Sequence, residues 1–241
     1  MGRSLKSRPV SDVQPPHLHL RPTAPLAERV LLPGDPGRAL LLAQILLEQP
    51  LMFNHHRGLW GYTGTAGDGE PLTIQATGMG GPSAAIVLTE LIALGARRAI
   101  RVGTCGAIAP GLELGRLLIA REAICADGTS RALGATERVG AAAALTEALE
   151  RAAPDAIAGA VVTVDLFYER GPVGAGHEAL AVEMEAAALF ALGASESVPV
   201  GCILTVSDTF DEAGARARIV DEALHQAVER AARAALAALP A

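Results

Sequence analysis

Short apolar runs alternate with alanine-rich or amphipathic stretches from residue 29 to the end of the chain. Apolar runs bounded by Gly, Pro or Asp are typical of buried strands, and we predict strands at 30–32, 99–102, 117–125, 159–164 and 200–206. The alanine-rich and amphipathic stretches predict helices at 36–48, 84–94, 140–153, 182–192 and 213–239. Because no polar or proline-rich linker separates these elements, the pattern predicts one α/β domain.

Capping and turn residues place several element boundaries. Asp35 followed by Pro36 is typical of a helix start, and Gly95 is typical of a helix end. The apolar runs 59–65 and 72–76 are separated by Gly-Asp-Gly-Glu, which predicts a hairpin. The strands mostly end in glycine-rich turns, and in α/β sheets such ends are where ligands bind.

Charge and cysteine usage narrow the possible partners. The 241 residues carry a formal net charge of -6, which repels polyanions, so we expect no nucleic-acid partner. Cys105, Cys125 and Cys202 lack the paired spacing of a zinc site or a disulfide framework, and we expect free thiols in a reducing cytosol.

The N-terminal segment 1–16 is basic but leads into prolines and histidines, so we expect a flexible arm before a domain at 17–241. No apolar run reaches the roughly 18 residues of a membrane span. The sequence therefore predicts a soluble cytoplasmic protein with no membrane partner.

Two arginines lie near the ends of predicted strands, beside glycine-rich turns. Arg38 ends the turn Gly-Asp-Pro-Gly-Arg in the first turn of a predicted helix, and Arg101 lies inside an apolar strand. A helix N-terminus and arginine side chains are the ingredients of an anion site, and one phosphate would satisfy both arginines. The alternatives are an ordinary capped turn with an exposed Arg38, and an intramolecular salt bridge for Arg101.

Carboxylates mark two further segments. Residues 182–187 (VEMEAA) place two of them around Met184, where one could accept hydrogen bonds from vicinal hydroxyls while Met184 packs on a sugar face. The alternative is that acids simply favour a helix N-terminus. Asp208 follows the strand 200–206 and is either a cap for the next helix or a site carboxyl with a perturbed pKa.

Other chemistries lack support in the sequence. The glycines at 78–81 do not have the spacing of a dinucleotide-binding turn, and no serine lies in a G-x-S-x-G elbow. His55 and His56 have no carboxylate or cysteine partners at ligand spacing, so we expect no metal site.

Taken in order, these segments resemble the trimeric and hexameric nucleoside phosphorylases, the family of bacterial purine nucleoside phosphorylase and uridine phosphorylase. The resemblance runs from about residue 17 to residue 208, through 34–38, 54–64, 78–80, 101–107, 165–168, 182–187 and Ser207-Asp208. It implies a single-domain, three-layer α/β fold whose central mixed sheet is twisted, partly barrel-like and flanked by helices.

The resemblance also implies roles for individual residues. Phosphate would be bound by Gly34, Arg38, Arg101 and Thr104, with Arg57 from a neighbouring subunit. Ribose would be bound by Met184 and Glu185, with the neighbour's His19, or alternatively His17, at the 5′-hydroxyl. The base would be bound by Phe167, Val182, Glu183 and Ser207. Asp208 would protonate purine N7, assisted by Arg216 or Arg218, a choice left open because the chain departs from the family pattern at 169–180 and after Asp208.

The implied reaction is phosphorolysis of purine ribonucleosides or deoxyribonucleosides in purine salvage, with phosphate as co-substrate and no metal or organic cofactor. The implied assembly is a homo-oligomer, a hexamer built as a trimer of dimers with shared sites. Uridine phosphorylase is the alternative, but Asp208 favours purines, because uracil lacks the N7 that a carboxylic acid could protonate. A nucleosidase would have no use for two phosphate arginines, and a binding protein without catalysis would not need every site residue. The sequence leaves open the preferred purine.

Overall fold

The computed structural model describes residues 19–168, 178–211 and 215–239, so the predicted arm at 1–16 and His17 lie outside the described residues. The described strands form one 11-stranded sheet in the order β11-β10-β6-β8-β9-β5-β1-β4-β3-β2, with β7 paired to β6. The strands are β1 (Arg29–Leu32), β2 (Leu47–Asn54), β3 (Gly61–Ala66), β4 (Pro71–Gln75), β5 (Arg98–Ala107), β6 (Leu117–Cys125), β7 (Arg138–Gly140), β8 (Ile157–Thr163), β9 (Ala181–Glu183), β10 (Val200–Phe210) and β11 (Arg216–Arg218).

The sheet is mixed and partly closed as a barrel. β1, β5 and β10 run parallel to one another, whereas β9 pairs antiparallel to β5 and β10 pairs antiparallel to β6. Because β10 pairs with both β6 and β5, the strands β5, β10, β6, β8 and β9 close into a ring. This confirms the predicted central mixed, partly barrel-like sheet.

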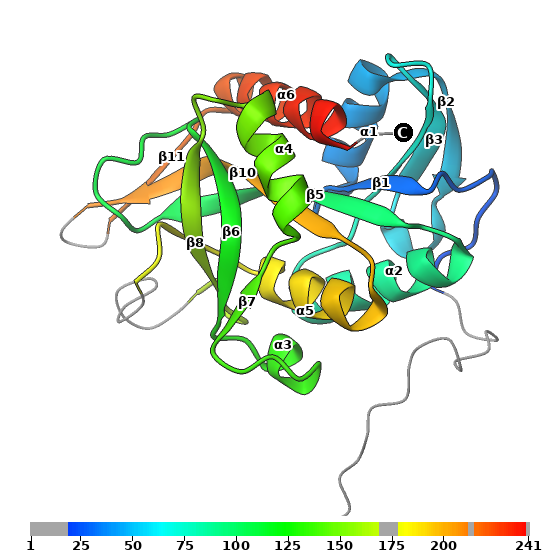
Figure 1. The fold of residues 1–241 in the computed structure, drawn as a ribbon. Coiled ribbons are helices and arrows are strands. Elements are labelled where there is room, and N and C mark those ends of the chain that lie inside the picture. Colours follow the sequence, from blue (N-terminus) through cyan, green and yellow to red (C-terminus); the bar gives the residue numbers. More distant parts are fainter. Residues whose placement is uncertain (1–18, 169–177, 212–214, 240–241) are drawn as a thin grey trace, which may run out of the picture.

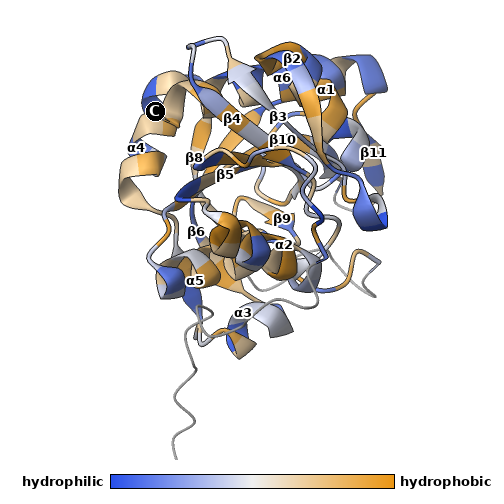
Figure 2. Cartoon of the chain, turned by 90° about the vertical axis from the view of Figure 1, so that its right-hand side faces the viewer, coloured by the Kyte–Doolittle hydropathy of each residue, from blue (hydrophilic) through white to orange (hydrophobic). Residues whose placement is uncertain are grey.

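Helices cover both faces of this sheet (Figure 1). They are α1 (Pro36–Leu46), α2 (Gly81–Leu94), α3 (Gly128–Ala132), α4 (Ala143–Ala152), α5 (Ala186–Glu196) and α6 (Asp221–Ala238). α1, α4 and α6 pack in one hydrophobic cluster, and α2 and α5 pack in another on the opposite face. Figure 2 shows apolar residues along the strands and on the helices that pack against them. Within the described ranges, no helix is both long and apolar enough to cross a bilayer.

The predicted caps and hairpin are confirmed. The Asp35 side chain accepts a hydrogen bond from the Arg38 N–H at 2.7 Å, and Pro36 occupies the first turn of α1. Gly95 ends α2 with φ 118°, a left-handed conformation that favours glycine. β3 and β4 form the predicted antiparallel hairpin.

Two predicted helix starts are wrong. Residues 182 and 183 belong to strand β9, and α5 begins at Ala186, because the Glu183 carboxylate accepts the Ala186 N–H and the strand pairs with β5 and β8. α6 begins at Asp221 rather than at 213, because residues 216–218 pair with β10 as strand β11.

Three predicted strand or helix ends also change. The helix predicted to residue 48 ends at Leu46, and residues 47–54 form β2 against β3. β5 does not break at Gly103 and β10 does not end at residue 206, because the two strands pair in parallel through Thr209 and Ala107. The two strands therefore stay paired across the glycine-rich stretch, with one register shift between Val206 and Asp208, and isolated turn propensity cannot predict this pairing.

Candidate active site

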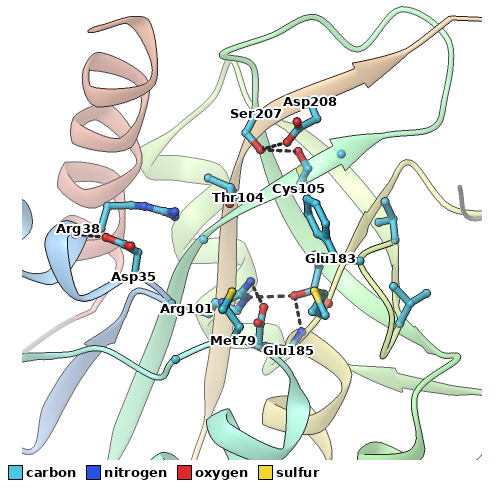
Figure 3. A pocket seen from close by; sticks show the side chains of 18 of the residues that line it. Asp35, Arg38, Met79, Arg101, Thr104, Cys105, Glu183, Glu185, Ser207 and Asp208 are labelled. Carbon is cyan, nitrogen blue, oxygen red and sulfur yellow. Dashed lines mark hydrogen bonds and ion pairs between the residues drawn. The ribbon is translucent and has the colours of Figure 1, made fainter. Parts of the chain in front are cut away.

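A cavity of about 470 Å³ opens at the carboxyl ends of the parallel strands β1, β5 and β10. Of the residues predicted for the site that the structure describes, every one except His19 lines it. These residues are Gly34, Arg38, Arg57, Arg101, Thr104, Phe167, Val182, Glu183, Met184, Glu185, Ser207, Asp208, Arg216 and Arg218. Figure 3 shows Arg38, Arg101 and Glu185 toward one end of the cavity, and Ser207 and Asp208 at the other. The cavity thus brings together residues that are far apart in the sequence.

Cations gather at the first of these ends. Arg38 is half-buried in the first turn of α1, where burial lowers the pKa of its guanidinium. Asp35 opposes that shift, while Arg101 and Arg218 add to it, which means that three guanidinium groups lie within electrostatic reach of one another. Glu185 opposes the shift as Asp35 does, so carboxylates partly offset these cations, and Arg38 and Arg218 are the ones available to attract an anion.

Arg101 makes intramolecular salt bridges and also keeps one donor unpaired, so both the salt-bridge and the anion-binding interpretations of the sequence remain possible. Its Nε donates to Glu183 Oε2 at 3.1 Å, and its Nη2 donates to Glu185 Oε2, so the intramolecular ion pairs exist. Its Nη1 is buried and has no hydrogen-bond partner among the described residues. A Cβ placed on Gly34 would lie 4.0 Å from this Nη1, which puts the unpaired donor beside the N-terminus of α1. Because a buried unpaired N–H is costly, this donor marks the place for an acceptor.

The two carboxylates of residues 182–187 have different surroundings. Glu185 is 6% exposed, accepts the Gly80 N–H at 2.6 Å through Oε1 and binds Arg101 through Oε2. The Glu183 carboxylate is deeper, and burial raises its pKa although Arg101 opposes the shift. Met184 is half-buried between them and faces the cavity. Glu185 and Met184 together offer a polar and a soft apolar surface to one ligand.

Asp208 lies within strand β10 and does not cap a helix, so that alternative is wrong. Its Oδ2 accepts the Ser207 hydroxyl at 2.7 Å, and its Oδ1 is buried without a hydrogen bond among the described residues. The Arg216 Nε lies 3.8 Å from Oδ1. Arg218 is the strand neighbour of Asp208 in the β10–β11 register, yet the ion pair is made by Arg216.

Aromatic rings surround this second end. The Arg216 guanidinium lies 4.4 Å from the centre of the Phe167 ring and 5.4 Å from that of Phe210. Phe210 lines the cavity but was not predicted; strand alternation from Asp208 would have indicated it if the strand had been extended that far. Cys105 also lines the cavity unpredicted, and burial raises the pKa of its thiol, so it contributes a neutral surface. An aromatic, largely apolar pocket with one carboxyl suits a flat heterocycle.

His19 lies outside this cavity. Its backbone N–H and its Nδ1 each lie 2.7 Å from Glu90 Oε1 on α2, and its side chain is 36% exposed. Arg57, predicted to serve a neighbouring subunit, lines the cavity of its own chain from a left-handed backbone with φ 60°. Among the residues that the structure describes, no cluster of His, Cys, Asp and Glu could hold a metal ion.

Comparison with known proteins gives one consistent result. Residues 28–240 match the phosphorylase superfamily. A purine nucleoside phosphorylase DeoD-type from Geobacillus kaustophilus is 38% identical over 226 residues, which cover 88% of this chain and 95% of the relative. The proteins of the same name from Caldanaerobacter subterraneus subsp. tengcongensis and Bacillus cereus are 38% and 39% identical, and each match covers 76% of this chain and 84% and 82% of the relative, respectively.

Proposed function

The chain belongs to the phosphorylase superfamily, and we propose that it cleaves purine ribonucleosides or deoxyribonucleosides with inorganic phosphate. The products are the free base and ribose 1-phosphate or deoxyribose 1-phosphate. The observation that carries the proposal is the unpaired Nη1 of Arg101, because it adds a buried donor to a site where the N-terminus of α1 and Arg38 already favour an anion.

The site supports an in-line arrangement of the three reacting parts. Phosphate is bound by Arg101 and Arg38, the ribose hydroxyls by Glu185, and the base beside Phe167 with its N7 near Asp208. A phosphate oxygen forms a bond to C1′ as the bond from C1′ to N9 breaks, and the bonding electron pair leaves with the base. Asp208 acts as the general acid that gives a proton to N7, so the base departs neutral. Positioning phosphate close to C1′ makes the attack effectively intramolecular.

Purines are favoured over uridine by Asp208, because a carboxylic acid can protonate N7 and uracil has no equivalent nitrogen. The relatives named above carry the same substrate class in their names. The test measures base release from inosine, guanosine, adenosine and uridine with and without phosphate. We expect purine base release only with phosphate. Release without phosphate would indicate a nucleosidase, and a faster rate with uridine would indicate a uridine phosphorylase.

An Arg38→Lys variant tests whether Arg38 belongs to the anion site. It keeps the positive charge but loses the planar, forked donor set of arginine. We expect an increased KM for phosphate with little change in the KM for the nucleoside. Equal changes in both KM values would place Arg38 outside the phosphate site.

The proposed active unit is a homo-oligomer with shared sites, a hexamer built as a trimer of dimers. Its support is the half-buried His19, which lies outside its own cavity, and the apolar side chains of Leu51 and Trp60, which are 58% and 40% exposed. Mixing an Arg57→Ala variant with an Asp208→Ala variant tests the sharing, because subunit exchange would create some intact sites. Mixing Arg38→Ala with Asp208→Ala is the control, since both residues line one chain's cavity and no activity should return. If Arg57 acts in its own chain, neither mixture recovers activity.

A further inference from the structure

We propose that Glu183 is a positioning residue that orients Arg101 toward phosphate, and that it does not contact the base. The inference rests on the proposed function, because it assigns Glu183 to the phosphate end of that same site. It differs from the role implied by the family resemblance, which placed Glu183 among the residues that bind the base.

The hydrogen-bonding capacity of the Glu183 carboxylate is filled from within the chain. Its side chain is 0% exposed. Oε1 accepts the Thr163 hydroxyl at 2.5 Å and the Ala186 N–H at 2.9 Å. Oε2 accepts the Glu185 N–H at 2.9 Å and Arg101 Nε at 3.1 Å, and shares the Ala186 N–H at 2.9 Å. A carboxylate has about four lone-pair sites, so none remains for a ligand.

These bonds fix the orientation of the Arg101 guanidinium. The group is planar, so holding Nε on Glu183 and Nη2 on Glu185 also determines where Nη1 points. Nη1 is the atom left buried and unpaired beside Gly34. If the bond to Glu183 were absent, the guanidinium could rotate about its bond to Glu185 and Nη1 would lose its fixed direction.

Glu183 also sets the start of α5, on which Glu185 depends. The N–H groups of Glu185 and Ala186 both donate to the Glu183 carboxylate. One side chain therefore connects Arg101, which is proposed to bind phosphate, with Glu185, which is proposed to bind ribose. This connection explains why a fully buried carboxylate is placed two residues before one that faces the ribose.

The test must separate positioning from a general structural role, and Thr163 provides the control. Its hydroxyl donates to Glu183 Oε1 and accepts the Ala187 N–H, so it supports α5 while the two ion pairs of Arg101 are made by other residues. In Glu183→Gln the side chain keeps its size, loses its charge and places an amide donor among N–H groups. Thr163→Val removes bonds at the same helix start and leaves the pair of Arg101 and Glu183 in place.

We expect Glu183→Gln to raise the KM for phosphate by about tenfold or more, because a charge-assisted bond to the ligand is misdirected. The KM for the nucleoside should rise less than the KM for phosphate, because the Glu185 side chain keeps its bond to the Gly80 N–H, and relative rates on inosine, guanosine and adenosine should not change. Thr163→Val should lower Tm but keep the phosphate KM within about twofold of wild type. If Glu183→Gln is not recovered folded, Glu183→Asp replaces it, since the shorter side chain withdraws the carboxylate from Arg101 and should also raise the phosphate KM.

An unchanged phosphate KM in a folded Glu183 variant would overturn the inference, and so would a change in base selectivity. An equal rise in the phosphate KM of Thr163→Val would also overturn it, because the effect would then come from α5 alone. Failure of the proposed function is recognised separately, since wild-type protein would then release no base from any nucleoside in the presence of phosphate.

Discussion

Replacing Arg101 by alanine should damage the stability of the protein as well as its activity. Arg101 is the only described cation paired with Glu183 and Glu185, whose side chains are 0% and 7% exposed. Removing one partner of a buried ion pair costs roughly 3 to 5 kcal/mol, because the remaining charge stays buried without its counter-charge. For a chain of this size each kcal/mol lowers Tm by about 2 to 4 °C, so we expect Tm to fall by roughly 6 to 20 °C.

The fall in Tm caused by Arg101→Ala should become larger as pH rises. Burial raises the pKa of Glu183, and Arg101 opposes that rise, so the pKa increases further in the variant. A carboxyl whose pKa is higher in the folded state favours folding at low pH, and this contribution is lost as pH rises from the unfolded value of about 4.3. The difference in Tm between wild type and Arg101→Ala should therefore be larger at pH 8 than at pH 5.

Arg38→Ala is the comparison that isolates the loss of phosphate binding. Arg38 is half-buried, and among the described side chains none forms a salt bridge with it. We expect its Tm to remain within about 2 °C of wild type, while its phosphate KM rises by about 10- to 100-fold, as for one charge-assisted bond. Thermal unfolding and steady-state kinetics on the same preparations give both quantities. Equal Tm values for the two variants would refute the structural role assigned to Arg101.

Three further outcomes test other parts of the structure. Asp208→Asn removes the transferable proton, so adenosine, which most needs N7 protonation, should lose the most kcat, by about 100-fold or more in a comparison across nucleosides. Hydrogen bonding to Arg29 lowers the pKa of Asp68 to about 2, a depressed value whose contribution is present above about pH 4 and lost toward pH 2, so Asp68→Asn should lower Tm at about pH 7 by a few degrees and have little effect near pH 2. A Cβ on Gly193 would lie 2.7 Å from the Val198 carbonyl oxygen, so Gly193→Ala should cost about 1 to 3 kcal/mol in urea unfolding without changing KM.

The described residues predicted for the site, except His19, line one cavity, whereas several predicted boundaries of the elements that carry them are wrong. Arg38 and Asp35 were placed correctly because capping is local: the side chain and the N–H that it binds are three residues apart. The start of α5 was misplaced because it depends on Glu183, whose partners include Thr163 and Arg101, 20 and 82 residues away in sequence. Helix propensity contains no information about such partners.

The base end of the cavity shows the same limit. Phe210 was missed because β10 was expected to end before Ser207, and only pairing with β5 and β11 carries the strand onward. The choice between Arg216 and Arg218 needed the geometry of β11, since both arginines lie on one face of that strand. The cap at Asp35 was therefore predictable from local signals, whereas the extent of β10 and the choice between Arg216 and Arg218 depend on strand pairing and were not.

The pairing of β5 with β10 has a consequence for when the protein becomes active. Ser207 Oγ lies 3.3 Å from the carbonyl oxygen of Cys105, which is 102 residues away in sequence, and the two parallel strands carry both ends of the cavity. Parallel pairing between distant segments requires a long loop to close, and the entropy lost in closing it precedes the stabilising contacts. Such pairing is therefore a slow step of folding. A nascent chain acquires its binding cavity only after β10 has left the ribosome, and until then the apolar edge of β5 stays uncovered. Yield during rapid synthesis should therefore depend on how quickly β10 joins β5, even for variants whose finished fold is as stable as wild type.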